Sequence, residues 1–301
     1  MNATPWSPGT ATGIGSMPGT DPFEAARVVV GELPDLPHLP ELPARGVGAD
    51  MIGRTAAMLV DLAVEVVPSG YRVTARPGRD HRRAVDLLRR DLDAFEEAVE
   101  RAGVRPKLVK VQAAGPWTLT SGIELPRGHR VLTDQGALRE FTESLSEGLA
   151  AHVTEVARRT GADVVVQLDE PGLPAVLSGL LPTPSKLGAV PAVPEPDARA
   201  TLAAVMESAE KASGNGVIAH CCAPIPPVTL LREAGASAIA FDATLLGAAP
   251  ATAWDELGEA WEAGTVLVLG LVPSTDPPAP VDLRSVAVPA LELADRLGFS
   301  R

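Results

Sequence analysis

The sequence predicts one α/β domain of the (β/α)8 TIM-barrel class, and three observations lead to this prediction. Apolar runs of strand length alternate with amphipathic runs of helix length along the 301-residue chain, which is typical of repeated βα units. Most apolar runs are continuous, as in parallel strands buried on both faces. Polar residues capable of chemistry follow several of these runs, and the carboxyl ends of barrel strands converge on one mouth. A doubly wound sheet would spread those residues along an edge, so we favour the barrel.

Seven segments are predicted to be helices because their apolar residues recur at spacings of three and four. The clearest runs from 79 to 103, where one face carries Val85, Leu88, Leu92, Phe95, Val99 and Ala102. A second clear run spans 136–159, and Asp134 precedes it as a candidate N-cap. The remaining helices are predicted at 22–32, 198–213, 227–234, 251–263 and 281–297.

The predicted strands are short and lie between these helices, at 12–16, 108–113, 164–168, 217–219, 238–241 and 266–271. The last predicted helix ends close to the final residue, so we expect the barrel to lack its eighth βα unit in this chain. Residues 1–10 are expected to form a flexible tail, and residues 11–301 a single barrel domain. A proline at every third position between 33 and 43 predicts an extended strap.

Composition and charge exclude several classes of function. Hydrophobic residues make up 46% of the chain, which is too many for a disordered protein. The net charge is −12, and no basic run offsets it, so we expect no nucleic-acid partner. No stretch approaches about 20 apolar residues, and the N-terminus lacks the pattern of a signal peptide. We therefore expect a cytoplasmic protein that acts on a small molecule and has no membrane partner.

The run His220-Cys221-Cys222, just after a predicted strand, is the sharpest local signal. Imidazole and thiolate groups both bind zinc well. In an extended segment His220 and Cys222 would face one side and Cys221 the other, because side chains alternate. A closed zinc site needs about four ligands, however, and a small buried run of this kind can also simply pack beneath loops.

Two adjacent acids, Asp169 and Glu170, follow another buried strand. A carboxylate at a barrel mouth can bind a substrate ammonium group or act as a base. Asp169 can equally cap the segment that follows it, and the residues alone leave both interpretations open. Asp242 follows a later strand, where an N-cap is the simpler explanation of its position.

Glycine-rich turns and histidines give weaker signals. The run Gly13-Ile14-Gly15-Ser16 can offer backbone N–H groups to an anion such as a carboxylate, or it can be an ordinary turn. Trp117 follows a turn at a strand end, where its ring is available for stacking.

Four of the five histidines lie outside the His-Cys-Cys run. We expect His81 and His152 to face solvent on helices, and His129 to be solvated in a polar loop, while His38 lies in the proline strap. No G-x-S-x-G, Walker loop or G-x-G-x-x-G motif is present.

Four segments together resemble the signature segments of the cobalamin-independent methionine synthase family. They are IGSMP at 14–18, GPWTL at 115–119, QLDEPGL at 167–173 and AHCCAP at 219–224. They occur in the family's order and at compatible separations. The similarity covers the family's C-terminal catalytic barrel, as in its short, single-barrel members.

The resemblance implies a zinc ion, Zn2+, at the barrel mouth, where it binds the thiol of homocysteine and lowers its pKa. The thiolate would then take a methyl group from a donor, and methionine would form. His220 and Cys222 match two of the family's metal ligands, and Asp242 falls where the family usually has a glutamate ligand. Asp169 matches the catalytic-site residue that receives the amino group of homocysteine.

The resemblance also assigns further residues to substrate binding. Ile14, Gly15 and Ser16 match the segment that holds the substrate carboxylate, and Asp50 is matched to a further acid that binds the amino group. The aromatic residue that stacks on the folate pterin is absent, although Trp117 lies close by. The donor is therefore either methyltetrahydrofolate or a methylated corrinoid.

The sequence departs from the family at two places. No cysteine follows Cys222, so the last zinc ligand of the family is missing, and residues 270–280 contain no histidine to match the family's acid histidine. Two other readings therefore stay open. One is a metal-free barrel enzyme similar to porphyrinogen decarboxylases, and the other is a non-catalytic barrel that binds an amino acid.

Overall fold

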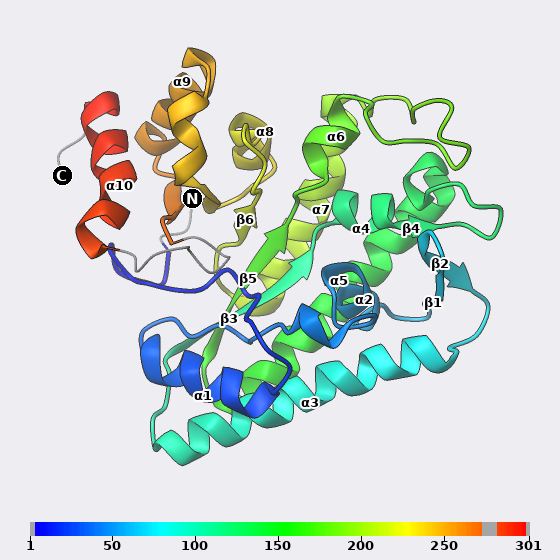
Figure 1. The fold of residues 1–301 in the computed structure, drawn as a ribbon, viewed down its shortest axis with the longest axis horizontal. Coiled ribbons are helices and arrows are strands. Elements are labelled where there is room, and N and C mark those ends of the chain that lie inside the picture. The colour runs from blue at the N-terminus through cyan, green and yellow to red at the C-terminus, as the bar shows by residue number, and fades with distance from the viewer. Residues whose placement is uncertain (1–3, 273–281, 299–301) are drawn as a thin grey trace.

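The centre of the molecule is a five-stranded parallel sheet with the strand order β3-β5-β6-β7-β8. Figure 1 shows two of these paired strands, β3 and β5, side by side in the middle of the molecule. The computed structural model describes residues 4–272 and 282–298. The central strands are β3 (Leu108–Ala114), β5 (Asp163–Asp169), β6 (Ile218–His220), β7 (Ala238–Asp242) and β8 (Val266–Gly270). A smaller sheet has the order β1-β2-β4, from β1 (Ala63–Val67), β2 (Gly70–Thr74) and β4 (Ile123–Glu124).

Helices follow the central strands and pack against them. The α-helices are α1 (Pro22–Glu32), α2 (Met51–Ala56), α3 (Arg79–Ala102), α4 (Pro116–Gly122), α5 (Gln135–Thr160), α6 (Leu173–Leu177), α7 (Glu195–Ser213), α8 (Val228–Glu233), α9 (Ala251–Glu262) and α10 (Leu283–Leu297). Short 3-10 helices are η1 (Pro43–Arg45), η2 (Val131–Thr133) and η3 (Ala243–Ala248). Each of the seven predicted helices is confirmed, with small shifts at the ends.

Five of the six predicted strands are confirmed, and the sixth is replaced by an extended segment. Residues 12–16 do not form a regular strand, but Ser16 bridges Glu41 of the proline strap in parallel. The strap in turn bridges β3, since Leu39 N donates to Lys110 O and Lys110 N donates to Pro37 O, each at 2.9 Å. Prolines in the strap have no N–H to donate, so the pairing stays at single bridges instead of a full ladder.

These two segments extend the parallel array beyond β3, giving the order of residues 12–17, the strap, and then the five central strands. The α/β class with parallel strands is therefore as predicted. In the described residues no pairing joins β8 back to residues 12–17, so closure into a barrel is not shown. The sequence prediction missed the hairpin of β1 and β2, whose strands pair antiparallel from Ala63 opposite Thr74.

The inner face of the array changes from apolar to polar along the strands. A small core cluster consists of Leu36, Leu108, Val165, Ile218, Ala238 and Ala240, with the half-buried Trp6 packed against it. Further along the same strands, at alternate positions, stand the polar residues Lys110, Gln167 and His220, all buried. A larger apolar cluster fills the space between the sheet and the helices. The polar end of the inner face is therefore where chemistry is possible.

Two histidines contradict the expectation of solvent exposure. His81 and His152 are buried, and burial lowers the pKa of His152 to about 3. Both lie on the apolar stripe of their helix, since His152 stands three residues after Leu149 and four before Val156. The periodicity that identified the helix also placed these side chains inside it.

The described part of the chain contains no helix with the length and hydropathy needed to cross a bilayer.

We predict that Gly148→Ala destabilises the fold, because a Cβ at Gly148 of α5 would lie 1.9 Å from the backbone oxygen of Met58. Overpacking of this kind costs about 1–3 kcal/mol, measurable as a lower free energy of unfolding in urea. Gly258→Ala in α9 is the matched control, since its Cβ meets only Leu297 Cδ2 at 3.5 Å. Equal effects of the two substitutions would contradict the close packing of α5 on this loop.

Candidate functional site

Asp169 and His220 form the centre of the candidate site because they end neighbouring strands in register. The pairing of β5 with β6 sets Asp169 opposite His220. Their side chains meet on the inner face, with His220 Nδ1 and Asp169 Oδ1 2.7 Å apart, and both are buried. In the described residues no hydrogen bond engages the other oxygen of Asp169, Oδ2, or the other ring nitrogen of His220, Nε2.

Lys110 and Gln167 lie beside this pair. The amide of Gln167 donates from Nε2 to Asp169 Oδ1 at 2.7 Å and to the backbone oxygen of Ile14 at 2.9 Å. The Nζ of Lys110 lies 2.6 Å from Gln167 Oε1. Lys110 is fully buried, and burial lowers the pKa of its ammonium group to about 8, against the fields of Asp169 and Glu41, which raise it.

Glu41 is a functional candidate that the sequence prediction missed. It lies in the strap and is buried on the inner side, where its Oε1 is 3.5 Å from Gln112 Nε2 and 3.3 Å from Arg54 Nε. Burial raises the pKa of Glu41 to about 7, with the Arg54 charge acting in the opposite direction and Asp169 adding to the rise. The sequence signal that could have identified Glu41 is an acidic residue placed between two prolines of the strap, Pro40 and Pro43.

Arg54 is held in turn by an acid in the middle of α3. Its Nη1 lies 2.6 Å from Asp91 Oδ2, and Arg45 Nη1 lies 2.7 Å from Asp91 Oδ1. All three side chains are buried. A buried acid flanked by two guanidinium groups is satisfied geometrically, so this network anchors Arg54 beneath Glu41.

The glycine segment of residues 13–15 is shaped by close approach of inner side chains. A Cβ at Gly13 would lie 2.2 Å from His38 Cε1, and one at Gly15 would lie 2.6 Å from Gln112 Nε2. Gly15 also has a φ of +132°, which side chains rarely tolerate. The side chains of Ile14 and Ser16 are exposed. The segment thus passes directly over the polar inner face.

Glu170 has a structural role that its neighbour Asp169 lacks. Its carboxylate accepts hydrogen bonds from Trp117 N at 2.9 Å, Thr118 N at 2.8 Å and Thr118 Oγ1 at 2.7 Å. These N–H groups belong to the first turn of α4, so Glu170 supplies the missing acceptors at that helix terminus. The two acids after β5 therefore divide between a helix cap and the site.

The residues predicted to bind metal lie near one another but do not form a closed cluster. His220 is buried and Cys222 is exposed two residues later. Partial burial raises the pKa of the Cys222 thiol, as do the nearby carboxylates of Asp169 and Asp242. The Oδ1 of Asp242 accepts from Thr244 N at 2.9 Å and Thr244 Oγ1 at 2.6 Å, which makes it the N-cap of η3.

Two observations decide how well these residues suit a metal ion. A carboxylate bound to Nδ1 of His220 leaves Nε2 for a metal, which is the usual arrangement of metal-ligating histidines. Nitrogen and sulfur donors suit zinc. Against this, no group of three or more His, Cys, Asp or Glu residues at metal-holding distances exists in residues 4–272 and 282–298. His220 and Cys222 therefore offer the types of donor atom that zinc prefers, without a third donor in place among the described residues.

Two predicted substrate-binding residues lie elsewhere. Asp50 is the N-cap of α2, and its carboxylate accepts from Gly53 N at 3.0 Å and from the Tyr71 hydroxyl. Trp117 is buried in the core, and its Nε1 donates to the backbone oxygen of Ala198 in α7 at 3.0 Å. The structure gives both residues structural partners, and neither is hydrogen-bonded to the side chain of Asp169 or His220 among the described residues.

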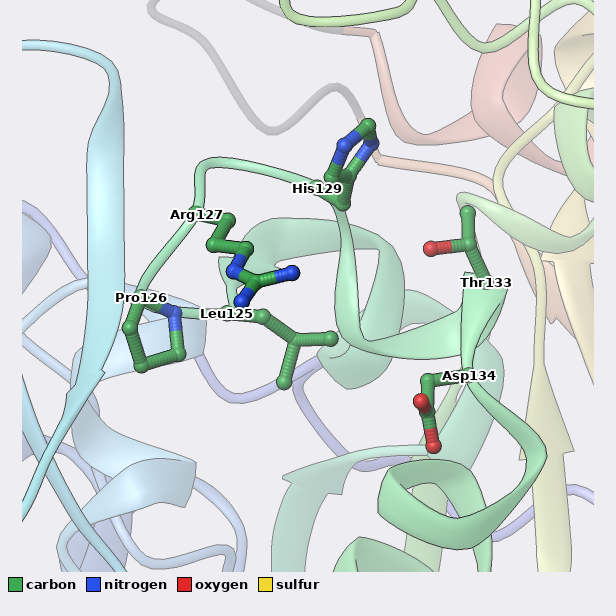
Figure 2. Close-up of a pocket in the computed structure, with 6 residues that line it drawn as sticks. All are labelled: Leu125, Pro126, Arg127, His129, Thr133 and Asp134. Atoms are coloured by element: carbon green, nitrogen blue, oxygen red, sulfur yellow. The ribbon is translucent and has the colours of Figure 1, made fainter.

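A surface pocket of about 610 Å³ lies apart from this cluster. Figure 2 shows its lining residues, which are Leu125, Pro126, Arg127, His129, Thr133 and Asp134. His129 is exposed there, as the sequence predicted. None of these residues belongs to the Asp169 cluster, and Asp134 is engaged as the N-cap of α5. We therefore place the candidate site at the strand ends.

Comparison with known proteins identifies a family for most of the chain. A family model described as "Cobalamin-independent synthase, Catalytic domain" matches residues 9–297. A search of curated protein sequences gives no match.

Two solved structures are similar at low identity. One is a B12-independent methionine synthase from Shewanella sp. W3-18-1 in complex with selenomethionine, with 12% identity, a TM-score of 0.44 and coverage of 78% of this chain and 63% of that chain. The other is the 3-keto-D-glucoside 4-epimerase YcjR from E. coli, with 9% identity, a TM-score of 0.37 and coverage of 70% and 74%. This chain thus spans less than two thirds of the length of the Shewanella enzyme.

We predict a pH-dependent stability contribution from Glu41. Because burial raises its pKa from 4.5 to about 7, the folded chain keeps the carboxyl protonated where the unfolded chain ionises it. The contribution of Glu41 to the free energy of unfolding is therefore fully present below pH 4.5 and is lost as the pH rises to about 7. Over this interval the free energy of unfolding falls by at most about 1.4 kcal/mol per pH unit.

The measurement is the free energy of unfolding in urea across that interval, for the wild type and for Glu41→Gln. The glutamine cannot ionise, so the free energy of unfolding of the wild type should fall relative to that of Glu41→Gln as the pH rises through this interval. A constant difference would contradict the burial of an uncharged Glu41.

Proposed function

Because the chain belongs to the family of cobalamin-independent synthase catalytic domains, we propose that it transfers a methyl group to the thiol of homocysteine and so forms methionine. The observation that carries the proposal is the buried pair of Asp169 and His220 at adjacent strand ends. One member has a free carboxylate oxygen for an ammonium group, and the other has a free ring nitrogen for a metal. Cys222 adds a sulfur donor on the same segment.

The metal ligands in this proposal are His220 and Cys222, with Asp242 as the third. Asp242 would have to leave or share its present bond to Thr244. A bound Zn2+ supplies one chemical effect, which is to lower the pKa of the substrate thiol so that thiolate is present near neutral pH.

The amino-acid part of the substrate meets the protein's own charged groups. Asp169 uses Oδ1 for His220 and Gln167, so its Oδ2 is available to accept a hydrogen bond from the substrate ammonium group. Glu41 is a second acid, close enough to Asp169 for the charge of Asp169 to raise the pKa of Glu41. The backbone of residues 14–16 is the proposed partner of the substrate carboxylate.

The transfer itself is a single displacement at carbon. A bond forms between the homocysteine sulfur and the methyl carbon while the bond from that carbon to the donor breaks, and the donor leaves with the electron pair. The proton lost by the thiol is released to solvent, and N5 of the folate takes up a proton when methyltetrahydrofolate is the donor. The chain holds the nucleophile in place, and the donor is methyltetrahydrofolate or a methylated corrinoid. Burial of Trp117 leaves it without a free face for a pterin, which favours the corrinoid.

Methyl transfer is tested by incubating zinc-loaded protein with homocysteine and each donor in turn. Methionine should form with at least one donor, and Asp169→Asn should abolish it. If homocysteine binds but neither donor yields methionine, the chain is an amino-acid-binding barrel and the proposed enzyme activity is wrong.

We predict that the purified protein contains about one zinc ion per chain, as in sites of this type, and that His220→Ala and Cys222→Ala lose it. Elemental analysis by mass spectrometry measures the ratio. Cys221→Ala is the matched control, because Cys221 is buried and apolar packing surrounds it. A wild-type protein that does not bind zinc, even after incubation with it, would argue for a metal-free site.

We also predict that Asp169→Asn weakens homocysteine binding by roughly 30-fold or more, because truncating one partner of a buried charge pair costs about 2 kcal/mol or more. Calorimetry on the zinc-loaded proteins measures the affinity. Asp163→Asn, at the exposed opposite end of the same strand, should bind as the wild type does. Equal affinities for Asp169→Asn and the wild type would remove Asp169 from the binding site.

A further inference from the structure

In the middle of the inner face lies an ammonium group that contacts no carboxylate among the described residues. Lys110 Nζ lies 2.6 Å from Gln167 Oε1, 3.2 Å from Gln112 Oε1 and 3.3 Å from the backbone oxygen of Ile14. All three partners are neutral amide oxygens, and they match the three N–H donors of an ammonium group. A fully buried charge without a counter-ion in contact is expensive, so its position calls for an explanation.

The ammonium group determines how the two glutamine amides are turned. Lysine can only donate hydrogen bonds, so each amide must direct its oxygen toward Nζ and its NH2 group away. The NH2 group of Gln167 is thereby directed at Asp169 Oδ1, at 2.7 Å. That of Gln112 is directed at the backbone oxygen of Leu39, at 2.8 Å, and toward Glu41 Oε1, at 3.5 Å.

The orientation continues from Asp169 to His220. Carboxylate oxygens accept hydrogen bonds, and the ring nitrogen that faces Asp169 Oδ1 is His220 Nδ1, at 2.7 Å. With the proton on Nδ1, Nε2 is left as the ring nitrogen that can bind a metal. Lys110 thus sets the orientation of the Gln167 amide, and the hydrogen bond from that amide helps to fix Asp169 Oδ1 beside His220 Nδ1.

We propose that Lys110 is a positioning residue that, by orienting the Gln167 amide, holds Asp169 against His220 and keeps the His220 proton on Nδ1. The site is prepared by this relay before any ligand arrives. The expected effect of this relay on zinc affinity rests on the proposed function, whereas the expected position of the proton on the His220 ring does not.

The structure offers a matched pair of variants for the test. Gln112 and Gln167 stand opposite each other on β3 and β5, and both accept from Lys110 Nζ, but only Gln167 contacts Asp169. Gln167→Leu removes the link between Lys110 and Asp169. Gln112→Leu removes the parallel link toward Glu41 and is the control.

The first readout is nuclear magnetic resonance of protein with 15N-labelled histidine, assigned with His220→Gln. In the wild type the His220 ring should carry its proton on Nδ1, and that proton should exchange slowly with water. In Lys110→Met and Gln167→Leu this proton should exchange faster and its chemical shift should change, because the Gln167 amide no longer holds Asp169 in place. Gln112→Leu should leave the His220 signals unchanged.

Gln167→Glu keeps the test valid if the apolar variants fail to fold. Glutamate retains an oxygen for Lys110 but replaces the NH2 group with an oxygen that repels Asp169, so the same change in the His220 signals is expected. The second readout is zinc affinity by competition with a chelator, which should fall about 10–100-fold in the Gln167 and Lys110 variants, as for other groups that orient a ligand.

Unchanged His220 signals in folded Gln167→Glu and Gln167→Leu would overturn the proposal, as would an equal effect of Gln112→Leu. Either result would leave the question of methyl transfer untouched. Conversely, the expected signals in a protein that forms no methionine would support the relay and contradict the proposed function.

Discussion

The register between β5 and β6 is the constraint on which the candidate site depends. It sets Asp169 opposite His220 at the same height on the inner face, and the two side chains bond there at 2.7 Å. A shift of one residue in either strand would turn one of these side chains to the helix-packed face. The proposed ligand Cys222 follows His220 by two residues, and the second proposed substrate acid, Glu41, lies within the electrostatic influence of Asp169.

The buried polar residues around the pair form a connected set in place of an apolar core. Lys110 is tolerated at the centre because three amide oxygens replace the water it loses. Gly13 and Gly15 allow the first extended segment to pass close over His38 and Gln112. The Asp91 network in turn holds Arg54 beneath Glu41. The apolar end of the inner face therefore contributes to the hydrophobic core, and the polar end provides the side chains of the candidate site.

The spacing of apolar residues predicts most helices and strands. The features that it does not predict depend on pairing between segments that are distant in the sequence. Helical periodicity predicts the long helices, and the same apolar stripe contains His81 and His152, which are buried for that reason. The sequence places Asp169 and His220 after separate strands, and the structure brings these two side chains together at adjacent strand ends. The place of Glu41 depends on the strap lying beside β3, which no local spacing encodes. The caps made by Glu170 and Asp50 likewise depend on where α4 and α2 begin.

The most direct test of the central claim, that this strand edge brings a cation and a substrate sulfur together, is zinc X-ray absorption spectroscopy on the zinc-loaded protein. We expect zinc neighbours that are nitrogen or oxygen atoms together with one sulfur, from Cys222. One additional sulfur neighbour should appear when homocysteine is added. Zinc neighbours without sulfur, or neighbours that homocysteine leaves unchanged, would contradict the claim.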